Sequence, residues 1–218
     1  MRKNSEDQVL ILGCNKSKDG VKTAHGIGTQ RFTLLKLELD DDVELKAQDK
    51  IFIRNSDEVK KIVRALSYDD LSNSEKSEVE KAVHSIVITN KDKYLNFYNS
   101  QTKDASKLHL LEGISQKSSL KFLAKKEELG DFKSFEDIDR KISFIDDSEN
   151  LIAKRVLYEL IEQQHVQKGR PVHLFVDVKM SRRKQEQKLD KFEDDDSFFL
   201  EKLKKQGLIE SSGKKLKF

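Results

Sequence analysis

The stretch KLHLLEGISQKSSLKFLAKKEE, residues 107–128, decides how the second half of this chain folds. It reads as a short helix, a tight turn at Gly113–Ile114–Ser115 and a longer helix. Two helices joined this tightly can simply pack together, or they can bind a phosphate. A phosphate site needs a backbone that the anion can approach, which favours glycine in the turn. It also needs a second helix whose free N–H groups and positive dipole end point at the anion.

Three lysines follow the turn at intervals of four residues. Lys117, Lys121 and Lys125 therefore lie on one face of the second helix. Leu120 and Leu123 lie on another face, which suits the core. Cations beside an anion-binding helix start would follow a phosphate backbone without reading bases, so that binding would be strongly salt-dependent. A lysine row on a solvated helix face is also ordinary, and this turn lacks the second glycine of the fuller motif. The spacing alone therefore leaves a packing role and a phosphate-binding role open.

The first third of the chain reads as short strands. Apolar or alternating segments are separated by turn residues, a pattern typical of a small antiparallel barrel or sandwich. These segments are DQVLILGC, VKTAHGIG, QRFTLLKLEL and DKIFIR. The next segment, DEVKKIVRALSY at residues 57–68, fits either a helix or a fifth strand, and the pattern leaves this open.

Beyond residue 68 the pattern becomes helical. Ser72 with Glu75 forms a capping-box pattern, and Ser134 with Asp137 forms a similar helix start. The segment PVHLFVDV that follows the helices looks like a buried strand that can rejoin the barrel. The final residues carry basic and acidic blocks, which are typical of a solvated, mobile tail.

Composition bounds the classes of function. The net charge is only +3, so any binding of nucleic acid must come from a local patch or from backbone groups. The single cysteine, Cys14, excludes an internal disulfide and a cysteine-rich zinc site, and a small buried hydrophobe is its expected role. No apolar run approaches the roughly 18 residues that span a bilayer, and the N-terminus lacks the apolar core of a signal peptide. The protein is expected to be cytoplasmic, with no membrane partner.

No catalytic or metal-binding pattern stands out. The five histidines are scattered, without a His-Glu-x-x-His pattern and without a cysteine pair. Gly26–Ile27–Gly28 is followed by a strand pattern, so it lacks the context of a dinucleotide-binding fingerprint. The acid pairs Asp69–Asp70 and Asp146–Asp147 sit at helix starts, where they stabilise the helix dipole. We therefore expect a non-enzymatic protein that needs neither a cofactor nor a metal.

Several passages together resemble a known family. They are, in chain order, QRFTLLKLEL, DKIFIR, ALSYDDLSNSEKSEVEKAV, NFYN, LLEGISQKS, FKSFEDIDRKI and PVHLFV. In this order they resemble an archaeal family of unknown function that is predicted to bind RNA, built from an OB fold followed by helix–hairpin–helix elements. The resemblance covers residues 8–178, and it implies RNA binding, in preference to DNA, with ribosome or ribosome-biogenesis components as further partners. The family's Pro-Gly-Ile-Gly hairpin becomes Glu-Gly-Ile-Ser here.

The barrel adds candidates of its own. OB folds bind single strands by stacking bases on aromatic side chains within a basic groove. Arg31 and Arg54 are the expected exposed contacts, whereas Phe32 and Phe52 are expected to fill the core of so small a barrel. The full set of predicted nucleic-acid-binding residues is Gly113, Ile114, Ser115, Lys117, Lys121, Lys125, Arg31 and Arg54.

The predicted fold class is α+β, with an N-terminal OB-like β-barrel followed by an all-helical helix–hairpin–helix domain. The expected divisions are a barrel at 7–68, a helical linker at 69–102, a helix–hairpin–helix domain at 103–170, a late strand at 171–178 and a charged tail at 179–218. The predicted function is RNA binding through the hairpin turn and the barrel. The alternative is a protein-interaction scaffold in which the hairpin only packs.

Overall fold

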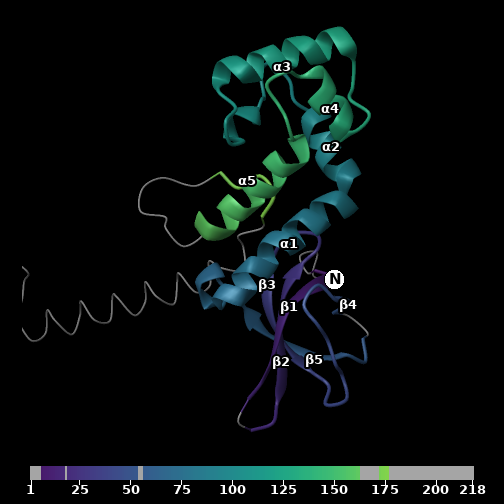
Figure 1. Cartoon of the computed structure of the whole chain (residues 1–218), viewed down its shortest axis with the longest axis vertical. Coiled ribbons are helices and arrows are strands. Elements are labelled where there is room, and N and C mark those ends of the chain that lie inside the picture. The colour runs from purple at the N-terminus through teal and green to yellow at the C-terminus, as the bar shows by residue number, and fades with distance from the viewer. Residues whose placement is uncertain (1–5, 18, 54–55, 163–171, 177–218) are drawn as a thin grey trace, which may run out of the picture. The chain divides into compact units, whose positions relative to one another are not determined.

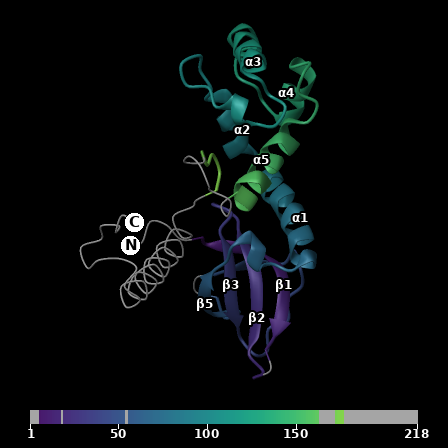
Figure 2. The ribbon, with the colours of Figure 1, turned by 90° about the vertical axis from the view of Figure 1, so that its left-hand side faces the viewer.

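The computed structural model describes residues 6–17, 19–53, 56–162 and 172–176. All of these residues belong to one compact unit, Met1–Asp177. A sheet formed by the first part of the unit is followed by helices, so the chain has the predicted α+β class (Figure 1 and Figure 2). The predicted tail lies outside the described residues, and so does Arg54.

Five strands form one antiparallel sheet. They are β1 (Gln8–Lys16), β2 (Lys22–Gly28), β3 (Leu34–Leu39), β4 (Lys50–Phe52) and β5 (Val59–Ala65), in the spatial order β4-β1-β2-β3-β5. The segment that fitted either a helix or a strand is therefore an edge strand. The pairing of β1 with β2 and that of β3 with β5 both contain register shifts, which bend strands and increase twist. The sheet curls into a half-barrel as a result.

The alternation along β1 divides its side chains between two hydrophobic clusters. Val9 and Ile11 join the cluster formed within the curled sheet. Leu10 and Leu12 point to the opposite face and join the cluster that includes the helices. The period of two in a strand thus lets β1 serve both clusters.

The helices are α1 (Asn73–Thr89), α2 (Lys91–Asn99), α3 (Gln116–Leu129), α4 (Phe135–Lys141) and α5 (Ser148–Glu162), with 3-10 turns η1 (Tyr68–Asp70) and η2 (Leu108–Leu110). Two predicted helix starts are confirmed. The carboxylate of Glu75 accepts the Ser72 N–H at 2.8 Å, and the Ser72 hydroxyl accepts the Glu75 N–H. The Ser134 hydroxyl accepts the Asp137 N–H at the start of α4.

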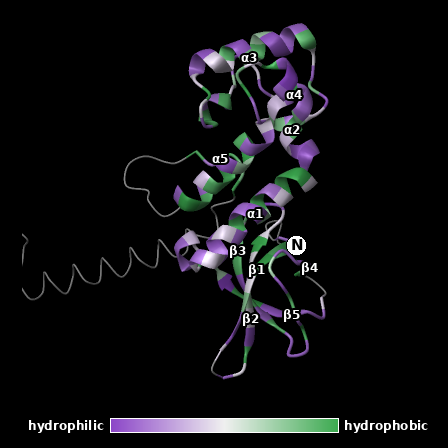
Figure 3. Ribbon diagram, viewed as in Figure 1, coloured by the Kyte–Doolittle hydropathy of each residue, from purple (hydrophilic) through white to green (hydrophobic). Residues whose placement is uncertain are grey.

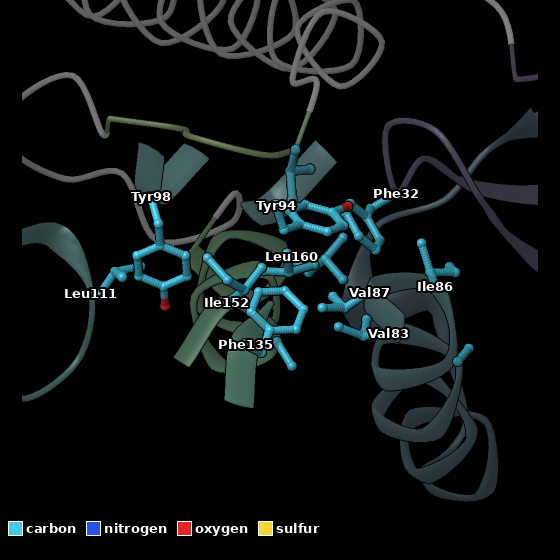
Figure 4. Close-up of a cluster of buried hydrophobic side chains, with 14 of the residues drawn as sticks. Phe32, Val83, Ile86, Val87, Tyr94, Tyr98, Leu111, Phe135, Ile152 and Leu160 are labelled. Carbon is cyan, nitrogen blue, oxygen red and sulfur yellow. The ribbon is translucent and has the colours of Figure 1, made fainter. Parts of the chain in front are cut away.

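The helices and the sheet share one core. Tyr94 and Tyr98 of α2 are fully buried, and the Tyr98 hydroxyl donates to the Ser148 carbonyl of α5 at 2.7 Å. Phe32, from the loop after β2, is also fully buried and lies beside Tyr94 in Figure 4. The prediction that Phe32 fills the core is therefore confirmed, although its partners include helical side chains.

A polar contact also joins β2 to α1. The Nδ1 atom of His25 lies 2.8 Å from Oε1 of Glu75, and both side chains are largely buried. Burial raises the pKa of Glu75, but hydrogen bonds from Ser72 and the nearby His25 outweigh burial and hold this pKa below its ordinary value. A Cβ at Gly13 would come within 3.1 Å of the Glu75 side chain. The residue that caps α1 therefore also positions the helix on the sheet.

The predicted late strand at 171–178 is not a strand where the structure describes it, at residues 172–176. The N–H groups of Leu174–Val176 donate instead to the carboxylate of Glu159 on α5, at 2.7 to 3.0 Å. The Phe175 ring packs edge-on against aromatic rings of α2. Because its N–H groups are bonded to a carboxylate, this segment cannot join the sheet, and it packs on the helices.

Two side chains differ from prediction because of where their strands lie. Phe52 is 59% exposed, since Ile51 takes the core position of the three-residue edge strand β4. Cys14 was expected in the core but is exposed near the end of β1. The exposed aromatic ring of Phe52 becomes important below.

Candidate nucleic-acid interface

The predicted hairpin turn is a four-residue turn with an open backbone. It is closed by a hydrogen bond from the Ile114 N–H to the Leu111 carbonyl, at 3.2 Å. Gly113, the third residue of the turn, has a φ of 74°, a value that glycine adopts without steric cost. A Cβ at this position would meet no atom within 4 Å. Since Ile114 is buried, the turn is anchored on one side and accessible at Gly113.

The element before this turn is shorter than predicted. It is the three-residue 3-10 helix η2 rather than an α-helix, and the side chain of Lys107, which precedes it, makes no capping hydrogen bond. Leu108 and Leu111 bury the segment in the core. Arg155 of α5 donates from Nη1 to the Leu110 carbonyl at 3.1 Å. The turn is therefore positioned by the buried Leu108 and Leu111 and by Arg155, and not by a first α-helix.

The start of α3 keeps free hydrogen-bond donors. Ser115 is the N-cap, and its hydroxyl accepts the Ser118 N–H at 3.0 Å. Within the described residues, the N–H groups of Gln116 and Lys117 have no hydrogen-bond partner. Two donors and the positive end of the α3 dipole are thus available to an anion.

The charge around the start of α3 also differs from that of the other α-helices. The first turn of α3 contains no acidic residue. The first turns of α1, α2, α4 and α5 contain Glu75, Asp92, Glu136, Asp137 and Glu149. Glu112, just before the turn, lies 3.3 Å from the ammonium of Lys154, which offsets its charge. The positive dipole end of α3 is therefore not neutralised by its own first turn.

The lysine row is exposed along α3, a largely hydrophilic helix in Figure 3. Among the described residues, neither Lys117 nor Lys121 has an ion-pair partner. Lys125 does have one, since its Nζ lies 2.8 Å from the Glu128 carboxylate. Two of the three lysines are therefore free to meet a ligand.

The core-facing side of α3 is displaced from the prediction by one position. Ser119, Phe122 and Leu123 are buried, so Leu123 takes its predicted place. Leu120 is 58% exposed and is not a core residue. It lies one helical turn from Lys117, on the solvent side.

The predicted barrel contact Arg31 belongs to a different part of the unit. It lies in the loop between β2 and β3, and its backbone N–H donates to the Glu6 carboxylate at 3.0 Å. Glu6 is buried and also accepts the N–H groups of Gln30 and Thr33, which fixes the loop. Neither β2 nor β3, the strands on either side of this loop, is among the elements that pack closely on α3, and Figure 1 shows α3 away from the sheet. Six of the eight predicted residues thus gather at α3.

Sequence reasoning missed the pair that supports this region. The Nε atom of Arg155 lies 2.8 Å from Oε1 of Glu159, and these side chains are 11% and 1% exposed. Arg155 holds the segment before the turn, and Glu159 holds residues 172–176. In the sequence they are only an i, i+4 pair of opposite charges, which is typical of a solvated helix face. No signal in the sequence marks them as buried.

Metal-binding clusters and membrane-spanning helices are both absent from the described ranges. Within them, no cluster of three or more His, Cys, Asp or Glu side chains is arranged to hold a metal ion. No helix in the same ranges combines the length and the apolar character needed to cross a membrane.

The fold and the open turn before α3 define an α+β protein with a curled five-stranded sheet and a helical part that presents a glycine turn. The chain belongs to a family of proteins of unknown function, DUF655, whose model matches residues 14–176. It is 24% identical over 143 residues to the uncharacterized protein MJ0038 of Methanocaldococcus jannaschii, covering 64% of this chain and 65% of that protein. It is also similar to the crystal structure of Af1531 from Archaeoglobus fulgidus, of the same family, with 27% identity and a TM-score of 0.70. That match covers 79% of this chain and 100% of the other.

These matches confirm the predicted resemblance as far as an archaeal family of unknown function. The match to MJ0038 spans just under two thirds of that protein's length. Neither the family description nor the names of the relatives assign RNA binding, so RNA binding stays a prediction.

Proposed function

We propose that this protein is a non-enzymatic, cytoplasmic RNA-binding protein that grips the phosphate backbone at the start of α3. One observation carries the proposal: an open turn at Gly113 leads into a helix whose first turn has free N–H groups and no acidic residue. Backbone N–H groups at a positive dipole end are a common way to bind phosphate. The lysine row beside them extends the same positive surface.

The expected contacts follow from this geometry. One phosphate approaches the backbone at Gly113 and accepts the N–H groups of Gln116 and Lys117. Lys117 and Lys121 lie about 6 Å apart along the helix axis, since each residue rises about 1.5 Å. This spacing is comparable to the step between neighbouring phosphates of one strand. Such contacts position a nucleic acid without reading bases, so sequence specificity should be weak.

The choice of RNA and of a ribosome-related setting comes from the family resemblance in the sequence. The finer description of the fold belongs to the same proposal. A curled five-stranded sheet whose edge strands are β4 and β5 supports an OB-like barrel that is open between these edges. The η2 turn, the glycine turn and α3 support a shortened helix–hairpin–helix element.

Replacing both Lys117 and Lys121 with glutamine is expected to weaken RNA binding for unrelated sequences. Each phosphate contact on a single strand contributes about 0.7 to the slope of log K against log salt. The double variant should therefore flatten this slope by about 1.4. Fluorescence anisotropy with a labelled RNA of about 20 nucleotides, measured between about 50 and 200 mM salt, gives both the affinity and the slope.

Lys125→Gln is the matched control, because the Lys125 ammonium is already paired with Glu128 on the same helix. Lys125→Gln should change the slope of log K against log salt by much less than substitution of Lys117 or Lys121 does. An unchanged slope in the double variant would place the contact elsewhere. Absence of measurable RNA binding at low salt would favour the scaffold alternative, in which the turn only packs.

A further inference from the structure

A hollow lies where β1, β4 and the end of α1 meet. Its polar lining consists of Gln8, Thr29, Lys50, Ser85, Thr89 and Asn90. Its volume is about 60 Å³. A cavity that holds one water molecule has a volume of about 10–15 Å³ on the same scale. The hollow can therefore take a few polar atoms of a ligand but not a whole base.

The exposed ring of Phe52 lies on the same face of β4 as Lys50, which lines this hollow. Lys50 and Phe52 flank the buried Ile51, so both side chains leave the same face of β4. The strand pairing sets Phe52 opposite Gln8 and Lys50 opposite Leu10, and Gln8, Leu10 and Lys50 all line the hollow. Two strand steps separate Lys50 from Phe52, or roughly 7 Å. A cation in the lining and an exposed aromatic ring opposite another lining residue therefore lie next to each other on one face of the sheet.

The charge of this hollow differs from that of other hollows in the unit. One of those is lined by Asp104, Glu127 and Asp131 and another by Asp92, Glu136 and Glu149, and each also has two lysines, so that carboxylates outnumber lysines there and disfavour a phosphate. The hollow beside Phe52 has no carboxylate in its lining and has one lysine.

Its polar groups are also available to a ligand. The Gln8 amide, the Ser85 hydroxyl and the Lys50 ammonium make no hydrogen bond to other side chains or backbone groups in the described ranges. These groups can donate to phosphate and can bond to sugar hydroxyls or to a base edge. Together with the exposed ring, they form the combination that proteins use to hold unpaired nucleotides.

We infer that this surface is a second contact, separate from α3, that holds one unpaired nucleotide of a single strand. The base stacks on Phe52, Lys50 meets the adjacent phosphate, and the hollow receives polar groups of the sugar or base. This inference rests on the proposed function, and it adds a preference for single-stranded segments that the contacts at α3 do not supply. A base in a duplex cannot stack on Phe52, because it is already stacked on its neighbours.

The test compares a ten-nucleotide oligouridine with a blunt RNA duplex, using the full chain and fluorescence anisotropy. Loss of base–aromatic stacking corresponds to a loss of affinity of roughly 5- to 160-fold, at about 1–3 kcal/mol per base. Phe52→Ala is therefore expected to weaken oligouridine binding by about tenfold and to leave duplex binding within about twofold. Phe52→Tyr should retain the affinity, because tyrosine can stack as well. Lys50→Gln should flatten the oligouridine salt slope by about 0.7.

Ile62→Ala is the matched control, since Ile62 is an exposed apolar residue (45%) on the other edge strand, β5. It should change neither affinity, and circular dichroism checks that each variant is folded. If the parent protein binds both RNAs and Phe52→Ala changes neither affinity, this inference is wrong while the proposed function stands. If the parent protein binds neither RNA, the proposed function itself fails.

Discussion

Replacing Glu159 with alanine is expected to lower the free energy of unfolding by about 3–5 kcal/mol, the usual cost of removing one partner of a buried charged pair. The side chain of Glu159 is 1% exposed. Its carboxylate accepts three consecutive N–H groups, from Leu174 to Val176, as well as the Nε–H of Arg155. The substitution would leave these three N–H groups without an acceptor and would remove the anionic partner of a mostly buried guanidinium.

Urea unfolding followed by circular dichroism measures this loss. Glu159→Gln should fall between the parent and the alanine variant, because the amide keeps one acceptor oxygen but has no charge. Glu162→Ala is a control on the same helix, where the carboxylate contacts only the exposed Tyr158 hydroxyl among the described residues. It should cost less than about 1 kcal/mol. A similarly small loss for Glu159→Ala would mean that the packing of Phe175 alone holds residues 172–176.

Replacing Gly113 with valine is expected to reduce RNA affinity by about 10- to 100-fold, more than any single lysine change. A hydrogen bond to a charged group contributes about 1.5–3 kcal/mol, and a valine side chain would stand where the phosphate approaches. The φ of 74° is also unfavourable for a β-branched residue, so some stability should be lost as well. Affinity and unfolding therefore need to be measured on the same preparation.

Gly130→Val separates these two effects. Gly130 caps the other end of α3, has a φ of 77°, and a Cβ there would also meet no atom within 4 Å. It should lose stability for the same reason as Gly113→Val but should keep its RNA affinity. Equal affinity losses in the two variants would show that strain in α3, and not access to the turn, controls binding.

The features that were predictable from the sequence depend on short-range bonds. Ser72 and Ser134 start helices by accepting N–H groups three residues ahead, and Ser115 does the same for α3. Each of these bonds lies within one helical turn, so the local pattern is sufficient. The glycine turn and the exposed lysine row are local for the same reason, and the structure places them as the pattern indicates.

The features that were not predictable depend on partners far along the chain. Residues 172–176 have the composition of a strand, but Glu159 binds their N–H groups from more than ten positions away. The segment that forms β5 fits both a helix and a strand, because most of its residues are exposed at a sheet edge and no alternation of buried and exposed positions marks it as a strand. The hollow beside Phe52 combines side chains of β1, β4 and α1, which no local pattern brings together.

A titration of the isotope-labelled protein with single-stranded RNA, followed by backbone amide NMR, tests phosphate binding at the start of α3 most directly. The N–H groups of Gln116 and Lys117 have no partner in the described structure, so a bound phosphate should move their resonances, and that of Gly113, more than those of other α3 residues. The corresponding Gly130 resonance, at the far end of the helix, should stay unchanged. The proposed role of α3 would be contradicted if the resonances of Gly113, Gln116 and Lys117 did not shift while RNA binds. It would also be contradicted if no RNA bound at low salt.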